Sequence, residues 1–387
     1  MLKLAIGSLV SGLVHFYVWR RIAAAVEPTR RTHRIMAVVM VLLFLSVPLT
    51  TSSRLWAPAL ASVIGWISGP WLAFVGVSAT LFGTIDVVKL VTWLGRKALR
   101  RPPAIGTALS RREFLARVTG GTAVAVAGAS VGRGMIEARG EHEVVEVEIA
   151  LAKLPRELDG FSIVQLSDLH TGMTIDRAFV QRVVDHANAL SPDLVALTGD
   201  LVDGPVDSLR DDIAPLANLR ARHGVFAITG NHEYYAGVDA WIAEISRLGA
   251  RYLRNERVTI GDGQASFDLA GVDDHSADNW VGHGEDLARA MDGRDPSRAL
   301  VLLAHQPRQV RRAAKHGVDL QLSGHTHGGQ IWPWHYIVRI QQGGLLAGRY
   351  EHDGTQLYVT RGCGYWGPPV RLLAPLEITR VILRSAA

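Results

Sequence analysis

Residues 320–330 read LQLSGHTHGGQ, a short apolar run that ends at Gly324 and is followed at once by His325 and His327. Strand side chains alternate between faces, so two histidines that are two positions apart share a face and can approach one cluster. Four earlier apolar runs also end in a polar residue of a metal-binding type. The polar residues that follow those runs are Asp168, Asp200, Asn231 and His305.

Short apolar runs alternate with amphipathic stretches through the last two-thirds of the chain. We expect strands at residues 144–150, 161–166, 193–198, 225–229, 299–304 and 320–323. We expect helices between them at 177–190, 208–222, 238–248 and 307–316. This alternation predicts an α/β sheet. Ligands of such sheets gather beyond the carboxyl ends of the strands, so the polar ends of the runs should converge on one site.

The residues at these ends form a mixed nitrogen and oxygen donor set. Histidines, carboxylates and one amide carbonyl suit Mn, Fe or Zn better than Mg. The chain has one cysteine, Cys363, which excludes both a disulfide framework and a cysteine-rich zinc module. The motifs are Asp168-Leu-His170, Gly199-Asp-Leu-Val-Asp203, Gly230-Asn-His-Glu233, His305 and Gly324-His-Thr-His327.

In this order, the motifs resemble those of the calcineurin-like metallophosphoesterases, over about residues 143–380. The segment Gly324–Gln330 is most similar to the bacterial membrane-anchored branch of that superfamily. The resemblance implies an α/β fold of two packed mixed β-sheets flanked by helices, a four-layer sandwich. It also implies two divalent metal ions as cofactors.

The resemblance assigns a role to each motif residue. One metal ion would be bound by Asp168, His170, Asp200 and His327. The other would be bound by Asp200, Asn231, His305 and His325, with Asp200 bridging the two ions. His232 would face the substrate, and Asp203 would orient His232.

Two metal ions that share a carboxylate are suited to phosphate ester hydrolysis. A hydroxide that bridges them would attack a phosphodiester, pyrophosphate or phosphomonoester bond. A protonated His232 would neutralise charge on the leaving oxygen. Tyr234 and Arg371 are further candidates for substrate contacts, although packing and a surface salt bridge are the ordinary roles of such residues. The alternative function is a membrane-bound metal-binding sensor or scaffold without turnover.

Charge is distributed unevenly along the 387 residues. Residues 1–140 contain 17 Lys and Arg against 4 Asp and Glu, a net charge of +13, whereas the remainder carries −8. Thirteen of the 15 histidines follow residue 140. This split indicates that the first third anchors the protein and that the rest carries the functional residues. The basic balance is no evidence for nucleic-acid binding, and we expect no such partner.

Three long apolar runs occupy the first third, at residues 4–19, 35–51 and 70–94. Each approaches the roughly 20 residues that cross about 30 Å of hydrocarbon. We therefore expect residues 1–95 to form transmembrane helices, with the lipid bilayer as a partner; buried helices of a soluble protein are the alternative. Basic residues follow the first and third runs, which places both of these loops in the cytoplasm.

Residues 96–140 are predicted to form a basic loop and a further hydrophobic segment at 118–136. The preceding Ser110-Arg-Arg-Glu-Phe-Leu115 resembles a twin-arginine export signal, which implies the export machinery as a partner. An ordinary basic flank before a loose helix is the alternative. Under either interpretation the segment crosses outward.

We therefore expect a multi-pass protein of the cell membrane whose catalytic domain, residues 141–387, is extracytoplasmic. Anchoring of this kind favours a lipid, lipid-linked or envelope phosphate as the substrate. Trp332 and Trp334 would then form an apolar lip that faces lipid, or else pack in the core.

Overall fold

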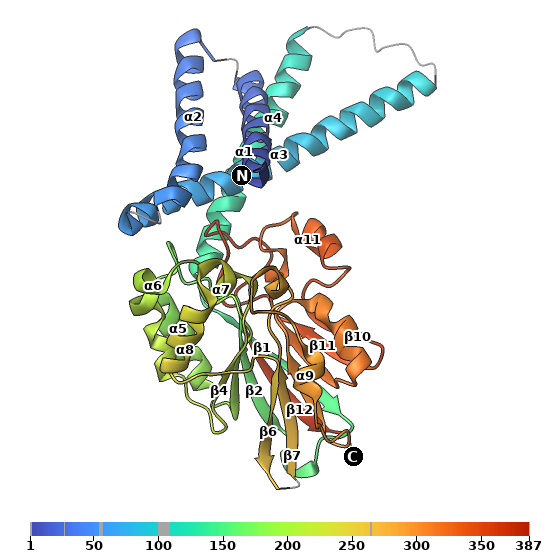
Figure 1. The fold of residues 1–387 in the computed structure, drawn as a ribbon. Coiled ribbons are helices and arrows are strands. Elements are labelled where there is room, and N and C mark those ends of the chain that lie inside the picture. The colour runs from blue at the N-terminus through green and yellow to red at the C-terminus, as the bar shows by residue number, and fades with distance from the viewer. Residues whose placement is uncertain (1, 27, 54–56, 100–108, 264, 387) are drawn as a thin grey trace. The chain divides into compact units, whose positions relative to one another are not determined.

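The computed structural model describes residues 2–26, 28–53, 57–99, 109–263 and 265–386 (Figure 1). The chain divides into two compact units. The first unit consists of Met1–Ile136 together with Pro368–Leu372, and the second consists of Glu137–Gly367 together with Leu373–Ala387.

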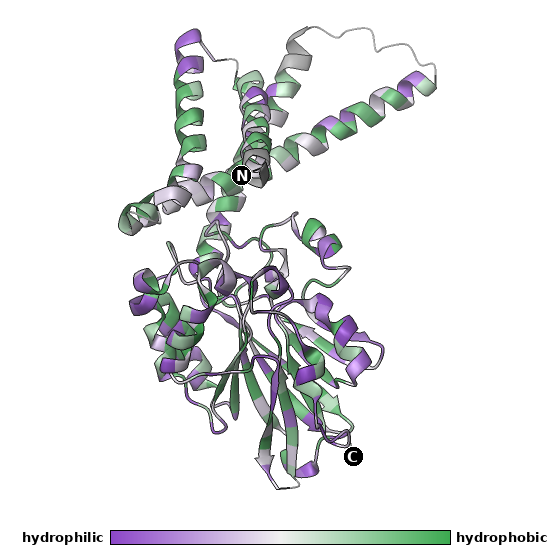
Figure 2. Ribbon diagram, in the orientation of Figure 1, coloured by the Kyte–Doolittle hydropathy of each residue, from purple (hydrophilic) through white to green (hydrophobic). Residues whose placement is uncertain are grey.

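The first unit is helical, and apolar residues cover much of its helices (Figure 2). Three helical segments in the described part of the chain are long and apolar enough to cross a membrane. They are Arg30–Ser53, Ala59–Ala98 and Phe114–Arg139, and they contain the apolar runs at 35–51, 70–94 and 118–136. The first predicted span, 4–19, lies in a helix that is not among these three, so it stays a prediction. The helices are α1 (Leu2–Val26), α2 (Arg30–Ser53), α3 (Pro58–Ala98) and α4 (Leu109–Arg139).

Polar side chains inside the first unit pair with one another. Asp86 of α3 accepts hydrogen bonds from Tyr17 at 2.7 Å and from Arg21 at 2.6 Å, both on α1. Trp71 Nε1 of α3 also donates to His15 Nε2 of α1 at 3.1 Å. Charged groups are costly in hydrocarbon unless they are paired. These contacts therefore tie α1 to α3 and satisfy the acidic group in the long apolar helix.

The second unit contains two six-stranded mixed sheets. The first sheet has the order β1 (Glu143–Leu151), β12 (Glu377–Ser385), β2 (Phe161–Leu166), β3 (Leu194–Leu197), β4 (Val225–Ala227) and β5 (Arg251–Tyr252). The second has the order β10 (Gly348–His352), β11 (Thr355–Val359), β9 (Leu320–Ser323), β8 (Leu300–Leu303), β7 (Ala265–Gly271) and β6 (Glu256–Asp262). Antiparallel pairing is confined to β12–β2, β6–β7 and β10–β11 among these strands.

Buried side chains organise the second unit into four layers. Along β2, Ile163 points into the core between the sheets, whereas Val164 points into the core under the helices. This alternation is the one expected of a strand that is buried on both faces. The first sheet is covered by α5 (Arg177–Ala189), α6 (Val206–Ile213) and α8 (Val238–Arg247), and the second by α9 (Leu287–Met291) and α10 (Val310–Ala313). The predicted fold of two packed mixed sheets flanked by helices is confirmed.

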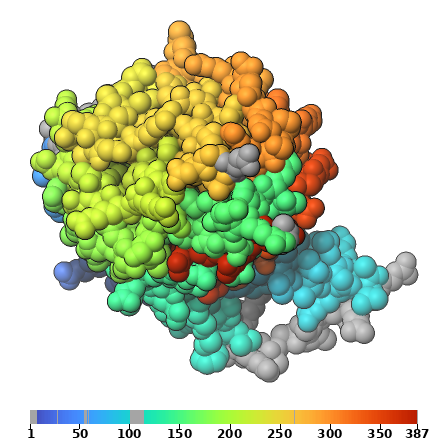
Figure 3. Space-filling view, turned by 90° about the horizontal axis from the view of Figure 1, so that it is seen from below, coloured from blue at the N-terminus to red at the C-terminus, as the bar shows by residue number. Residues whose placement is uncertain are grey.

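The last strand enters the middle of the first sheet. β12 pairs in parallel with β1 along nine residues and antiparallel with β2, so the end of the unit is inserted beside its beginning. In Figure 3 the end of the chain (red) accordingly lies beside segments from the start of this unit (green). This strand and β5, β6, β7, β10 and β11 are not among the strands expected from the sequence.

Two predicted helices are shorter than expected. The helix predicted at 208–222 ends at Ile213 and continues only as a 3₁₀ turn, Ala214–Asn218. Pro215 lies at the start of that turn and lacks the N–H that a continuing α-helix needs. The helix predicted at 307–316 contains a single α-helical segment, α10, between two 3₁₀ turns.

A buried glutamate connects the two sheets. Glu377 of β12 accepts hydrogen bonds from Tyr358 of β11 at 2.8 Å and from Thr379 at 2.7 Å. Arg361 Nε donates to the same carboxylate at 2.6 Å. Glu377 is 2% exposed, so its charge depends on these partners in place of water.

Replacement of Glu377 should destabilise the fold strongly. Glu377→Ala removes the acceptor of Arg361 Nε and of the buried hydroxyls, so we expect the free energy of unfolding to fall by about 3–5 kcal/mol. Thermal unfolding of the full chain in detergent measures the change. The control is Glu256→Ala, which removes an exposed ion pair with Arg251 and should change the free energy by less than about 0.5 kcal/mol. Equal melting temperatures for the two variants would contradict this account.

Candidate metal centre

Five of the seven predicted ligands lie where the backbone turns sharply after a strand. Their φ angles are positive: +57° at Asp168, +53° at Asp200 and +71° at His325. His170 and His327 each have a φ of +52°. Residues other than glycine rarely adopt this left-handed conformation, which costs about 1–3 kcal/mol and is concentrated at functional sites. The surrounding structure therefore holds these side chains in place against their backbone preference.

Asp168, His170 and His327 form the first cluster of potential ligands. All three are buried, and each offers one atom within 4.8 Å of the others. His170 Nε2 lies 3.0 Å from His327 Nε2, and His327 Nε2 lies 3.4 Å from Asp168 Oδ1. Three donor atoms that face one another at this spacing can hold a cation.

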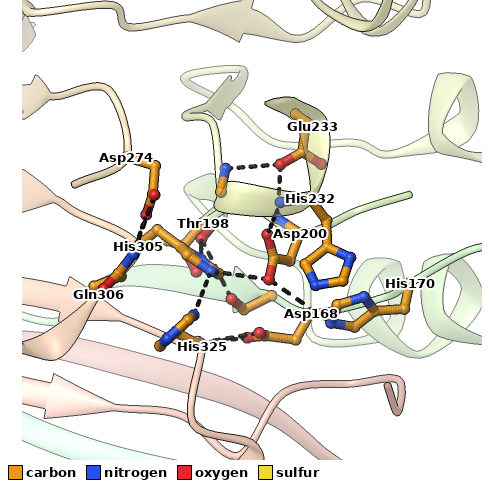
Figure 4. A network of polar contacts seen from close by, with 12 residues as sticks. Asp168, His170, Thr198, Asp200, His232, Glu233, Asp274, His305, Gln306 and His325 are labelled. Carbon is orange, nitrogen blue, oxygen red and sulfur yellow. Dashed lines mark hydrogen bonds and ion pairs between the residues drawn. The ribbon is translucent and has the colours of Figure 1, made fainter. Parts of the chain in front are cut away.

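Asp200, His305 and His325 form the second cluster (Figure 4). Asp200 Oδ2 lies 3.1 Å from His305 Nε2, which lies 3.3 Å from His325 Nδ1. The same oxygen of Asp200 lies 3.8 Å from His170 Nε2 of the first cluster. The Asp200 carboxylate therefore lies between two sets of potential metal ligands.

The hydrogen bonds of two histidines leave one ring nitrogen of each available for a cation. His305 Nδ1 donates to the carbonyl of Thr198 at 2.8 Å, and His170 Nδ1 donates to Asp203 at 2.8 Å, which leaves Nε2 of each ring for a metal ion. Asn231 Oδ1 is buried and has no hydrogen-bond partner within the described structure. Buried polar atoms normally have a partner, so this amide oxygen is a further candidate ligand.

Burial and neighbouring charges shift the pKa values of this cluster. Burial raises the pKa of Asp200, but His305, His232 and His170 outweigh burial and hold that pKa well below its usual range. Burial, reinforced by repulsion from His305, lowers the pKa of His325 to about 3. His325 is therefore neutral near pH 7. Asp200 and Asp168, in contrast, outweigh burial and raise the pKa of His305 above its usual range, so a cation at His305 Nε2 would displace a proton.

Asp203 orients two histidines with one oxygen. Its Oδ1 lies 2.7 Å from His232 Nδ1 and 2.8 Å from His170 Nδ1. The backbone N–H of His232 also donates to Asp200 Oδ1 at 2.8 Å. His232 is therefore held beside both clusters, with its Nε2 left for another partner.

Glu233 has a structural role beyond its place in the Gly-Asn-His-Glu motif. Its buried carboxylate accepts hydrogen bonds from the backbone N–H groups of Asp200 at 2.9 Å, Leu201 at 2.7 Å and Gly230 at 2.7 Å. The third residue of a helix commonly binds back to the residue before that helix, and Glu233 is the third residue of α7 (Asn231–Ala236). That spacing was the available signal for Glu233.

Two glycines allow the loops to approach the carboxylates closely. A Cβ atom at Gly230 would overlap Asp200 Oδ1, and one at Gly324 would overlap Asp168 Oδ2. The glycines of the Gly-Asn-His-Glu and Gly-His-Thr-His motifs therefore make room for the two acidic ligands.

Tyr234 and Arg371 are the two predicted substrate contacts, and both side chains are buried. Tyr234 is 3% exposed and packs with Val238 and Ala277, with its hydroxyl 3.2 Å from that of Thr229. Arg371 is fully buried, in the segment that belongs to the first unit. The contacts of Tyr234 are therefore those of a packing residue, which is the ordinary role of such a side chain.

Comparison with known proteins identifies the family. A family model described as calcineurin-like phosphoesterase matches residues 161–329. An uncharacterized metallophosphoesterase of Helicobacter pylori (strain J99) is 40% identical over 248 residues, which cover 64% of this chain and 65% of that protein. A zebrafish (Danio rerio) protein described as a transmembrane protein with metallophosphoesterase domain is 34% identical over 330 residues, covering 83% of this chain and 74% of that protein. This chain belongs to the calcineurin-like phosphoesterase family.

The membership confirms the resemblance that the motifs indicated. An uncharacterized metallophosphoesterase of Bacillus subtilis (strain 168) is also 33% identical over 288 residues, which cover 72% of this chain and 98% of that protein. The calcineurin-like phosphoesterases are metal-dependent phosphoric ester hydrolases. The buried clusters of aspartate and histidine provide the potential metal ligands that such chemistry requires.

The fit between Gly230 and Asp200 can be tested by metal binding. Gly230→Ala should displace the Asp200 carboxylate and lower the affinity for Mn²⁺ by at least about tenfold. Equilibrium dialysis with elemental analysis of the full chain measures the bound metal. The matched control is Gly95→Ala, since nothing lies within 4 Å of the added Cβ there. Unchanged Mn²⁺ affinity in Gly230→Ala would contradict the proposed position of Asp200.

Proposed function

We propose that this chain is a membrane-anchored phosphoesterase that hydrolyses a phosphodiester, pyrophosphate or phosphomonoester bond with two divalent metal ions. The observation that carries the proposal is the position of Asp200 Oδ2, 3.1 Å from His305 Nε2 and 3.8 Å from His170 Nε2. A carboxylate between two buried donor sets is the arrangement that two-metal hydrolysis needs.

The ligands would divide into two sets. Asp168, His170, Asp200 and His327 would hold one ion, and Asp200, Asn231, His305 and His325 would hold the other. This nitrogen-rich set favours Mn, Fe or Zn over Mg. Bound there, the ions would supply Lewis-acid activation of water and neutralise phosphate charge.

His232 would act on the leaving group. Asp203 fixes its Nδ1 at 2.7 Å, so Nε2 is the atom left to donate a proton to the departing oxygen. Asp203 would act through His232 as a positioning residue. In the protein chain alone, burial lowers the pKa of His232, but Asp200 and Asp203 outweigh burial and raise it to about 9.

The membrane part of the proposal is supported by the first unit. Three helical segments of the described chain suit a membrane by length and composition, and the zebrafish relative is described as a transmembrane protein. The same anchoring favours a lipid, lipid-linked or envelope phosphate as substrate. The twin-arginine-like segment precedes the last of these helices, which supports the export machinery as a partner; the side chains of Arg111 and Arg112 lie outside the described residues.

Hydrolysis of bis(4-nitrophenyl) phosphate by the full chain with Mn²⁺ tests the function. Asp200→Asn should lower kcat by more than about 100-fold, because the bridging ligand is weakened. His232→Ala should lower kcat by about 10²–10⁴-fold while the bound Mn²⁺ is retained, because only proton transfer is lost. His352→Ala, at a solvent-accessible histidine beside Asp353, is the control and should leave kcat unchanged.

The outcome separates the two functions that the sequence left open. A wild-type chain that binds Mn²⁺ but hydrolyses neither this diester nor 4-nitrophenyl phosphate nor pyrophosphate would favour a sensor or scaffold. Wild-type turnover in Asp200→Asn would refute the assignment of the centre.

Reporter fusions test the orientation of the chain in the membrane. We expect the catalytic unit outside the cytoplasm, because basic residues place the preceding loop inside and Phe114–Arg139 then crosses outward. A reporter enzyme that is active only in the cytoplasm, fused after Ala387, should therefore be inactive. The control fusion, after Gly95, should be active. Activity of the Ala387 fusion would reverse the proposed orientation.

A further inference from the structure

Nine large apolar or aromatic side chains are exposed among the described residues of the second unit, and we call six of them the apolar rim. Their exposed fractions run from 40% at Trp332 to 80% at Ile340. Single exposed apolar residues are common, but a group of this size usually marks a binding surface. The rim consists of Tyr235, Trp332, Tyr336, Ile337, Ile340 and Trp366.

Two members of the rim flank His232. The ring centre of Tyr235 lies 5.3 Å from that of His232, and the ring centre of Trp366 lies 6.1 Å from it. Both aromatic rings are more than half exposed, whereas Tyr234, the preceding residue of α7, is buried. An organic group attached to a phosphate at His232 would therefore meet aromatic surface on leaving the centre.

The rim is joined to the loop that carries His325 and His327. Gln330, which follows His327 in that loop, donates to the carbonyl of Trp366 at 2.8 Å and accepts from its N–H at 2.9 Å. A Cβ atom at Gly329 would overlap His335, the first residue of α11 (His335–Gln341), so this helix begins directly against the loop.

The apolar side of α11 continues the rim away from the centre. Tyr336, Ile337 and Ile340 are its exposed apolar residues. α11 lies at the same end of the second unit as α7 (Figure 1), and its apolar turns are visible in Figure 2. A surface of tryptophan, tyrosine and isoleucine is typical of proteins that contact the interface between lipid and water.

We propose that the apolar rim binds the hydrocarbon part of an amphiphilic phosphate ester presented by a lipid bilayer. The inference rests on the proposed function and names its substrate class. The chain itself supports a lipid source: the candidate membrane segment ends at Arg139 and β1 begins at Glu143. Three intervening residues span roughly 10 Å, so the catalytic unit would be tethered close to lipid.

Two diesters that differ only in their alkyl chain test this inference. Methyl 4-nitrophenyl phosphate and hexadecyl 4-nitrophenyl phosphate are offered to the full chain in lipid nanodiscs with Mn²⁺. In both, water adds to phosphorus, the bond to the aryl oxygen breaks, and 4-nitrophenol leaves with an alkyl phosphate as the other product. The metal centre and His232 therefore meet the same reacting atoms, and kcat/KM for the two esters reports the alkyl chain.

We expect wild-type kcat/KM to be at least tenfold higher for the hexadecyl ester. The double variant Ile337→Ser with Ile340→Ser should reduce this preference by roughly tenfold, because it removes apolar contact area from the rim. Val144→Ser, at an exposed apolar residue of β1 outside the rim, is the matched control and should keep the preference. Melting temperature and bound Mn²⁺ of each variant show that the fold and the centre are intact.

The results distinguish failure of the inference from failure of the proposed function. If neither ester is hydrolysed, phosphodiester hydrolysis is ruled out as the proposed function, and the inference falls with it. If both esters are hydrolysed equally, or the double variant keeps the wild-type preference, the rim does not select the substrate. An altered oligomeric state in the double variant with an unchanged preference would assign the rim to a contact between copies of the chain and would also overturn the proposal.

Discussion

One carboxylate, that of Asp200, must reach donors that come from both sheets. His170 follows β2 of the first sheet and His305 follows β8 of the second, yet the same oxygen of Asp200 lies within 4 Å of a nitrogen of each. The carboxyl ends of these parallel strands meet at one end of the sandwich, which makes the convergence possible. The left-handed backbone at Asp200 and the absence of a side chain at Gly230 leave space for this carboxylate.

A buried charged site of this kind depends on an outer layer of hydrogen bonds. Glu233 accepts hydrogen bonds from three backbone N–H groups around Asp200. Asp203 accepts hydrogen bonds from the Nδ1 atoms of two histidines. The Asp203 contacts fix which ring nitrogen of each histidine faces the centre, and the Glu233 contacts hold the backbone that carries Asp200. The same principle operates between the sheets, where Glu377 gathers Arg361 and the hydroxyls around it. Polar networks are stable in a core only when every member is satisfied.

The strands that lead to the candidate centre have a clearer signal in the sequence than several strands around them. Asp168, Asp200 and His325 follow short, fully buried strands, and an apolar run with a polar end is a local signal. By contrast, β6 has an exposed face and β10 is half exposed, so neither forms a continuous apolar run. β12 is long, but nothing local indicates that residues near 380 pair with those near 145 and 165.

The sequence by itself determined which residue types are available for metal chemistry, the chain order of their motifs and the division between basic apolar helices and an acidic α/β region. These depend on composition and on neighbours a few positions apart. Only the tertiary structure decided that Tyr235 is exposed beside His232 while Tyr234 is buried, and that Trp366 is held by Gln330 at the edge of the centre. Such outcomes depend on packing between segments that are distant in the chain. This packing produces no repeating hydrophobic pattern in the sequence of either segment.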